Sequence, residues 1–217
     1  MLLLALDTST PAVTVALHDG ERVVAEVTTV DARRHTELLM PQVVEVLSAA
    51  HASRRDLTDI AVGAGPGPFT GLRVGLAAAR TLGAALDLDV RGVCSLDVLA
   101  HEVVAEARAD GPFAVASDAR RREVYWAAYD ADGRRSHGPA VAGAADVAAT
   151  IGLLPAAGAG ARLYPDAFAR ALDPEFPSAG RLAEAVVTGS VETLAPDPLY
   201  LRRPDATPAT TRKSVLT

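Results

Sequence analysis

The chain has 217 residues, enough for one large domain or for two domains of about 100 residues each. Hydrophobic residues make up 49% of it and charged residues 22%, which favours a packed core over wholesale disorder. The net charge of -6 argues against a protein that itself grips nucleic acid, because contacts to phosphates need a basic surface.

Cysteine content and the N-terminal run indicate where such a protein works. Cys94, the only cysteine, can form neither an internal disulfide nor a cysteine metal cluster, which fits a reducing cytosol. The apolar run over residues 2–6 is only as long as a strand and has no basic leader, so we expect neither a signal peptide nor a membrane span. We therefore predict a cytoplasmic protein with no membrane partner.

Apolar periodicity and turn residues predict the first elements in chain order. We expect strands over residues 2–6, 13–17 and 22–30, and then a helix over 36–50 in which Pro41 makes a kink or an irregular first turn. A strand over 60–63 and a helix over 71–86 follow, then a strand over 90–93. Ser95 is predicted to cap the N-terminus of a helix over 96–108.

The pattern then starts again, which indicates an internal duplication. The stretch LALDTSTPAVTVALHDG, from residue 4, aligns without a gap with VASDARRREVYWAAYDADG, from residue 115, and Asp7 matches Asp118. The sequence therefore predicts an α/β protein with two β-β-β-α lobes, over residues 1–108 and 109–203. The second lobe is expected to be reduced, since residues 140–160 are rich in Ala and Gly, and residues 204–217 are expected to be a disordered tail.

The acidic residue at the end of the first strand of each copy leaves two interpretations open. Asp7 and Thr8 can simply cap a local turn, as Asp and hydroxyl side chains often do. Alternatively, Asp7, Thr8 and Ser9 face Asp118 across a cleft and hold a metal–nucleotide unit. These four residues are the candidates for nucleotide binding.

The stretch GAGPGPFTGLRVGLAAAR, from residue 63 to residue 80, looks like a phosphate loop but fails each test for one. Leu72 and Arg73 follow its last turn glycine where a Walker loop needs Lys and Ser/Thr, and no G-x-G-x-x-G spacing occurs. Pro66 and Pro68 also lack the N–H groups that a phosphate would accept from. What remains is a rigid turn, with Thr70 expected to cap the following helix.

That helix carries small residues nearly all round, and again two interpretations stay open. It can pack tightly on its own sheet, or it can have a second face that docks on a partner helix. The helix over 36–50 also has apolar residues on more than one side. The two helices could supply half of a four-helix interface.

Metal and nucleophile chemistry find little support. The histidines show neither H-x-x-x-H nor H-E-x-x-H spacing, no G-x-S-x-G occurs, and Cys94 and Ser95 have no base at a motif distance. We expect no catalytic residue and no metal site.

Several motifs together resemble the TsaB (YeaZ) family of the bacterial machinery that makes threonylcarbamoyladenosine (t6A) in tRNA. They are LALDTST, RRHTELLMPQV, GPGPFTGLRVGLAAARTLGAAL, GVCSLDVLA, DARRREVYWAAYD and PDPLYLRRP. The resemblance covers about residues 1–205 and is dense to Asp130. It implies the duplicated actin/Hsp70-like ATPase (ASKHA) fold, in agreement with the internal repeat.

The resemblance also implies a role. TsaB proteins are paralogues of TsaD, the catalytic subunit, whose two metal-binding histidines correspond here to Ser95 and Leu99, neither of which replaces imidazole. It implies a non-catalytic scaffold that binds TsaD, with TsaE as a further partner, a self-dimer when alone, tRNA reached only through the complex, and ATP or ADP at most at the complex interface. The implied partner-binding residues are Thr36, Leu39, Met40, Val43, Phe69, Thr70, Gly71, Arg73, Val74, Gly75, Ala78 and Leu82.

Two other functions remain as alternatives. One is a nucleotide-dependent, kinase-like ASKHA enzyme that uses Asp7 and Asp118, although the second copy only faintly suggests an adenosine loop. The other is a metallopeptidase, a label some relatives have carried, which this sequence does not support because it lacks a histidine pair and a nucleophile.

Overall fold

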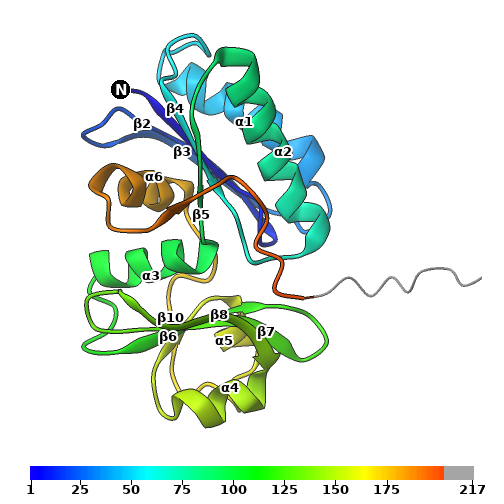
Figure 1. Cartoon of the computed structure of the whole chain (residues 1–217), viewed down its shortest axis with the longest axis vertical. Helices are drawn as coiled ribbons and strands as arrows, with labels where there is room; N and C mark the ends of the chain where they lie inside the picture. The colour runs from blue at the N-terminus through cyan, green and yellow to red at the C-terminus, as the bar shows by residue number, and fades with distance from the viewer. Residues whose placement is uncertain (203–217) are drawn as a thin grey trace, which may run out of the picture.

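Two β-sheets organise residues 1–202, the part of the chain that the computed structural model describes (Figure 1). The first sheet has the order β11-β5-β4-β1-β2-β3 and the second has the order β10-β9-β6-β7-β8. In each sheet the first three strands of a copy form an antiparallel meander, and later strands join it in parallel, except for β11, which pairs antiparallel with β5 at the edge of the first sheet. The predicted tail over 204–217 lies outside the described residues.

The elements repeat in order along the chain, which confirms the duplication. The first copy comprises β1 (Leu3–Asp7), β2 (Ala12–His18), β3 (Val23–Val30), α1 (His35–Ala49), β4 (Asp59–Gly63), α2 (Phe69–Leu86), β5 (Val90–Val93) and α3 (Ser95–Ala105). The second comprises β6 (Phe113–Asp118), β7 (Glu123–Tyr129), β8 (Arg135–Gly143), α4 (Ala144–Ile151), β9 (Ala156–Ala157), α5 (Ala159–Leu163), β10 (Ala171–Leu172) and α6 (Ala179–Thr188), and β11 (Thr193–Leu194) follows. The second copy is reduced in its later strands and in α4 and α5, as predicted.

Each copy gives its last helix to the other copy's sheet. Helices α1 and α2 cover one face of the first sheet, and α6 covers the other face against β1 and β2 (Figure 1). Helix α3 packs on β6 and β7 of the second sheet, while α4 and α5 lie on its opposite face. The predicted boundary at residue 108 therefore separates the two copies of the repeat, but it does not separate the two packed units.

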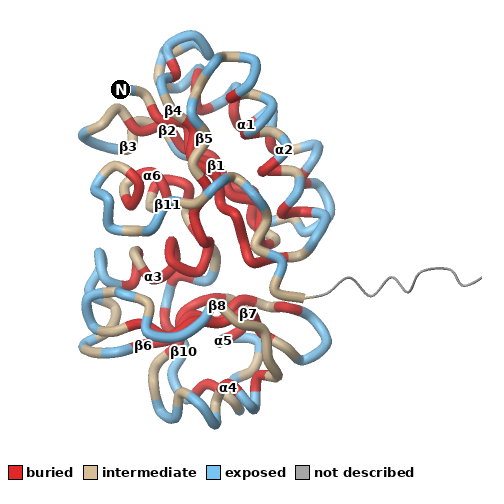
Figure 2. The backbone as a smooth tube through the Cα atoms, in the orientation of Figure 1, coloured by how far each residue is buried: buried red, intermediate tan, exposed pale blue. Residues whose placement is uncertain are grey.

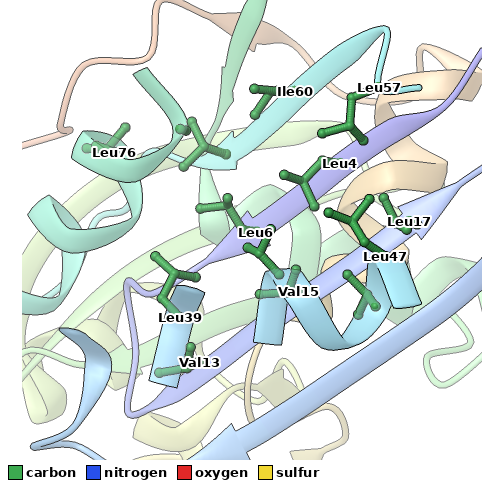
Figure 3. Close-up of a cluster of buried hydrophobic side chains, with 14 of the residues drawn as sticks. Leu4, Leu6, Val13, Val15, Leu17, Leu39, Leu47, Leu57, Ile60 and Leu76 are labelled. Atoms are coloured by element: carbon green, nitrogen blue, oxygen red, sulfur yellow. The ribbon is translucent and has the colours of Figure 1, made fainter. Parts of the chain in front are cut away.

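Burial of β1 on both faces explains its unbroken apolar run. Leu4 and Leu6 point into the cluster under α1 and α2, where they meet Leu39 and Val15 (Figure 3). Leu3 belongs to the cluster on the opposite face, under α6. Because alternate residues of a strand face opposite sides, a strand covered on both sides must be apolar throughout. Figure 2 shows buried segments at the centre of each lobe.

The ends of the helices correct two predictions. Helix α2 begins at Phe69, one residue before the expected cap Thr70, and neither Thr70 nor Pro68 caps it with a side chain. Helix α3 begins at Ser95 itself, so Ser95 is not an N-cap, and Cys94 occupies that position without a side-chain bond. Helix α1 continues as one helix across Pro41.

Candidate functional site

The first strand-end acid, Asp7, is fully buried at the end of β1. Its carboxylate accepts a hydrogen bond from the Ser95 hydroxyl, with 2.6 Å between Oγ and Oδ2, and another from the Ser9 backbone N–H, with 2.6 Å to Oδ1. Burial raises the pKa of Asp7, and the hydrogen bonds from Ser95 and Ser9 oppose that rise. The Asp7 carboxylate is therefore occupied by hydrogen bonds in the interior of the protein.

Ser95 connects three segments that are far apart in the sequence. Besides donating to Asp7, its hydroxyl accepts from the Gly65 N–H at 3.2 Å, and its own backbone N–H donates to the Gly65 carbonyl at 2.7 Å. The hydroxyl thus ties β1, the glycine-proline turn and the start of α3 together. Ser95 is used here as a structural hydrogen-bonding group, which explains its burial better than a cap or a nucleophile does.

Thr8 explains two of the three glycines of α2, Gly71 and Gly75. Its hydroxyl donates to the Gly71 carbonyl at 2.7 Å and accepts from the Gly75 N–H at 2.9 Å, so it stands between two groups that would otherwise bond each other along the helix. A Cβ on Gly75 would lie 2.5 Å from the Thr8 Oγ1, and one on Gly71 would lie 2.7 Å from the Thr8 carbonyl oxygen. These two glycines let α2 approach its own sheet.

A cleft of about 380 Å³ lies between the lobes, and residues from both copies line it. Its size falls in the lower part of the range for small-molecule pockets, roughly 300–1,000 Å³. The lining residues are Ser9, Thr10, Pro11, Pro66, Gly67, Pro68, Ser117, Asp118, Arg120, Tyr125, Ala159, Arg162, Leu163, Glu175 and Phe176. The Ser9 hydroxyl is buried there without a hydrogen-bond partner.

The cleft brings together only part of the predicted nucleotide set. Ser9 and Asp118 line it, whereas Asp7 and Thr8 do not. Asp118 accepts from the Arg120 backbone N–H at 2.7 Å and pairs with the Arg120 guanidinium at 3.3 Å, so part of its charge is already balanced. Arg162 is likewise paired, with Asp173.

Sequence reasoning missed most of the cleft's walls. Tyr125 and Phe176 supply aromatic surface, and burial together with the charge of Asp118 raises the pKa of Tyr125. Arg120 lies in a run of three residues, 120–122, with φ between 55° and 63°, a left-handed conformation that non-glycine residues seldom adopt. The run of three arginines is visible in the sequence, but a short basic run does not distinguish the wall of a cleft from a solvated surface.

The outer face of α1 and α2 carries exposed apolar side chains. Met40 is 42% exposed, Val44 63% and Phe69 47%, and these residues belong to the two helices that cover the same face of the first sheet. Thr36, Thr70 and Arg73 are also exposed, and Val74, Ala78 and Leu82 are half-buried. Large apolar side chains grouped on an exposed face commonly mark an interaction site.

Four predicted partner contacts lie inside the lobe instead. Leu39 and Val43 belong to the core under α1, and Gly71 and Gly75 face Thr8 and β1. Being buried, they can shape a docking face but present little side-chain surface on it.

The described residues also bear on metal and thiol chemistry. Between residues 1 and 202, no group of three or more His, Cys, Asp or Glu side chains could hold a metal ion. Leu99 is buried in the apolar cluster of the second lobe. Burial raises the pKa of the Cys94 thiol to about 12, so it stays protonated near neutral pH and is a poor nucleophile.

None of the helices formed by residues 1–202 is long and apolar enough to cross a membrane.

Comparisons with known proteins agree with this geometry. The family model of TsaD, tRNA N6-adenosine threonylcarbamoyltransferase, matches residues 22–190. An uncharacterised protein of Mycobacterium tuberculosis is 48% identical over 214 residues, which cover 94% of this chain and 93% of the relative. The tRNA threonylcarbamoyladenosine biosynthesis protein TsaB of Escherichia coli is 38% identical over 132 residues, or 61% of this chain and 56% of that protein. The structure of YeaZ from Pseudomonas aeruginosa superposes with a TM-score of 0.76 at 35% identity and covers 92% of this chain and 99% of that one.

Two duplicated lobes that exchange their last helices across a central cleft define a protein of the actin/Hsp70-like ATPase fold. Within that class, the similarity to TsaB and YeaZ proteins settles the relationship: the chain belongs to the TsaB/YeaZ family.

Proposed function

We propose that this chain is a non-catalytic scaffold subunit of the machinery that forms t6A in tRNA, and that it binds a TsaD-like catalytic subunit. The observation that carries the proposal is the exposed apolar face of α1 and α2, with Met40, Val44 and Phe69. Relatives named for t6A biosynthesis support the pathway, and the TsaD family model supports the kind of partner.

The interior of the first lobe supports a non-catalytic role. Asp7, the acid that would hold a metal–nucleotide unit, is buried and hydrogen-bonded to Ser95. Ser95 and Leu99 offer no imidazole for a catalytic metal. The chain then acts by holding its partner, and tRNA, a TsaE-like ATPase and any ATP or ADP engage the assembled complex in the cytoplasm.

Co-purification with a tagged TsaD-like subunit from the same organism tests the proposal. We expect Val44→Asp and Phe69→Asp each to abolish recovery of the partner, since both place a charge in an apolar interface. Leu153→Asp is the matched control, because Leu153 is 88% exposed in the second lobe, far along the chain from α1 and α2. Gly75 is unsuitable for this test, because a side chain there disrupts the contact with Thr8.

Recovery of the partner at wild-type levels with both charged variants would refute the proposed face. The same face is open to a second copy of this chain, and we propose that the self-dimer and the partner compete for it. Raising the partner's concentration should then convert dimer into heterodimer in analytical ultracentrifugation.

A nucleotide-dependent enzyme remains the second candidate, and the inter-lobe cleft is the observation in its favour. It predicts that the isolated chain binds and turns over ATP with Mg²⁺. Isothermal titration at millimolar nucleotide that shows no heat of binding would exclude this candidate.

A further inference from the structure

The C-terminal segment, residues 195–202, returns to the first lobe and lies against α2. It follows β11 at the edge of the first sheet, where a Cβ on Gly92 would come within 2.5 Å of the Ala195 carbonyl oxygen. The Leu199 N–H donates to the Ala64 carbonyl at 2.9 Å, and Asp197 pairs with Arg80 of α2 at 3.0 Å. In Figure 1 the segment crosses from α6 to the end of α2 nearest the second lobe.

Tyr200 of this segment completes an aromatic platform on α2, made of Phe69, Arg73 and Tyr200. The Tyr200 ring stacks on Phe69, with 5.2 Å between ring centroids. The Arg73 guanidinium lies 3.5 Å from the centroid of the Phe69 ring, and its Nε donates to the Tyr200 hydroxyl at 2.7 Å. Phe69 and Tyr200 remain 47% and 43% exposed, so the platform is ordered by its own contacts and still open to a partner.

The charge of the platform is unbalanced. Within residues 1–202, no carboxylate lies within 4.0 Å of the Arg73 guanidinium, whereas Arg80 on the same helix has Asp197. The stacking and the bond to Tyr200 hold the guanidinium in one place. Arginine and aromatic side chains that are already ordered make strong binding contacts, because little rotamer freedom is left to lose.

We propose that the C-terminal segment is part of the docking surface, and that the TsaD-like partner binds the aromatic platform with an apolar surface carrying a carboxylate opposite Arg73. The inference rests on the proposed function and extends it from α1 and α2 to a segment more than 100 residues away in sequence. Tyr200 is then a partner-binding residue that lies outside α1 and α2, so the apolar pattern of the two helices does not predict it.

At the platform itself, charge complementarity favours a partner that supplies a carboxylate over a second copy that meets it platform to platform. Two identical subunits that meet platform to platform across a two-fold axis would bring Arg73 against Arg73 with no carboxylate between them. A partner that supplies the carboxylate gains a charge-assisted hydrogen bond in a setting partly shielded from water.

Affinity measurements on the full chain with the purified TsaD-like subunit test the proposal. We expect Tyr200→Ala to raise Kd about 30-fold, since loss of an aromatic anchor has effects of that order. Tyr200→Phe keeps the ring and loses the bond from Arg73, so a smaller rise of about threefold is expected. Leu153→Ala, a control on the second lobe, should leave Kd unchanged.

The dependence of affinity on salt concentration tests the partner's carboxylate separately. Affinity of the wild type should fall as salt rises, and Arg73→Gln should both weaken binding and flatten that dependence, because it removes the charge. Sedimentation of the chain alone reports on the other occupant: an effect of Tyr200→Ala on the self-dimer but not on the partner complex would assign the platform to a second copy and overturn the proposal.

The outcomes separate this inference from the proposed function. Loss of binding with Val44→Asp but unchanged Kd with Tyr200→Ala and Arg73→Gln would overturn the role of the C-terminal segment alone. Unchanged Kd with Val44→Asp and Phe69→Asp as well would refute the whole face. A truncation after Arg202 that tightens binding would show that residues 203–217 occupy the platform, and would also overturn the proposal.

Discussion

The first strand of each copy of the repeat ends at an equivalent position. The residues that follow there differ between the two copies, and so do their contacts. The first copy reads Asp7-Thr8-Ser9 and the second, at the same offset, reads Asp118-Ala119-Arg120. Asp7 is buried and bonded to Ser95, and Thr8 is inserted into α2. Asp118 faces the cleft and pairs with Arg120, while Ala119 offers only a methyl group.

A repeat in sequence therefore predicts equivalent positions, but not equivalent sites. In the first lobe Asp7 and Thr8 hold α3 and α2 to the sheet, while Ser9 lines the cleft. In the second lobe the corresponding helices are short, and the polar residues are free to line a cleft. Substitutions that act on one lobe and not on the other test this difference.

The largest effect is expected where Thr8 enters α2. Gly75→Leu would place a side chain on the Thr8 hydroxyl and displace two buried hydrogen bonds, so we expect the free energy of unfolding to fall by about 3 kcal/mol or more. Gly111→Leu is the control, since a Cβ at Gly111 meets no atom within 4 Å. Urea denaturation measures both, and equal losses for the two variants would contradict the role given to Thr8.

The two strand-end acids give the next largest contrast. Asp7→Ala leaves the buried Ser95 hydroxyl and Ser9 N–H without their acceptor, which we expect to cost about 2 kcal/mol. Asp118→Ala removes contacts to an exposed Arg120, so a loss of about 0.5 kcal/mol is expected. Thermal unfolding of the two variants measures the difference. If Asp118→Ala were the less stable variant, Asp7 would contribute less to stability than Asp118, and the prediction would be wrong.

Much of the fold could be predicted from the sequence because local signals were strong there. Buried strands such as residues 2–6 are apolar throughout, and the gapless repeat places β6 and β7 correctly. The exchange of α3 and α6 between the sheets could not be predicted, because both helices are apolar on the faces they bury and neither pattern says which sheet receives them.

The site was less predictable because it depends on contacts distant in sequence. The small residues of α2 are compatible with a partner or with the chain's own sheet, and only the structure shows Thr8 between Gly71 and Gly75. Tyr200 sits in a short run with no periodicity, so its stacking on Phe69 left no signal. Val44, by contrast, is an exposed apolar residue on an amphipathic helix and could be suspected from the pattern alone.

A pH-dependent effect is expected at the junction where the copies exchange helices. Burial, with the nearby charge of Glu106, raises the pKa of Glu102 on α3 from 4.5 to about 7, and Arg181 and Arg108 only partly oppose this. The folded chain then keeps the Glu102 proton between about pH 4.5 and 7 while the unfolded chain releases it, so stability falls as pH rises through that window.

Glu102→Gln cannot titrate, so the wild type should lose stability relative to this variant between pH 5 and pH 7.5, by on the order of 1 kcal/mol after screening by solvent. Burial also raises the pKa values of Asp7 and Asp97, but both acids are present in each protein and cancel in the difference. The urea denaturation midpoints of the wild type and of Glu102→Gln at the two pH values measure this difference in stability. A difference that does not change with pH would mean that Glu102 is already ionised in the folded protein, with its charge balanced by Arg108 and Arg181 across the junction.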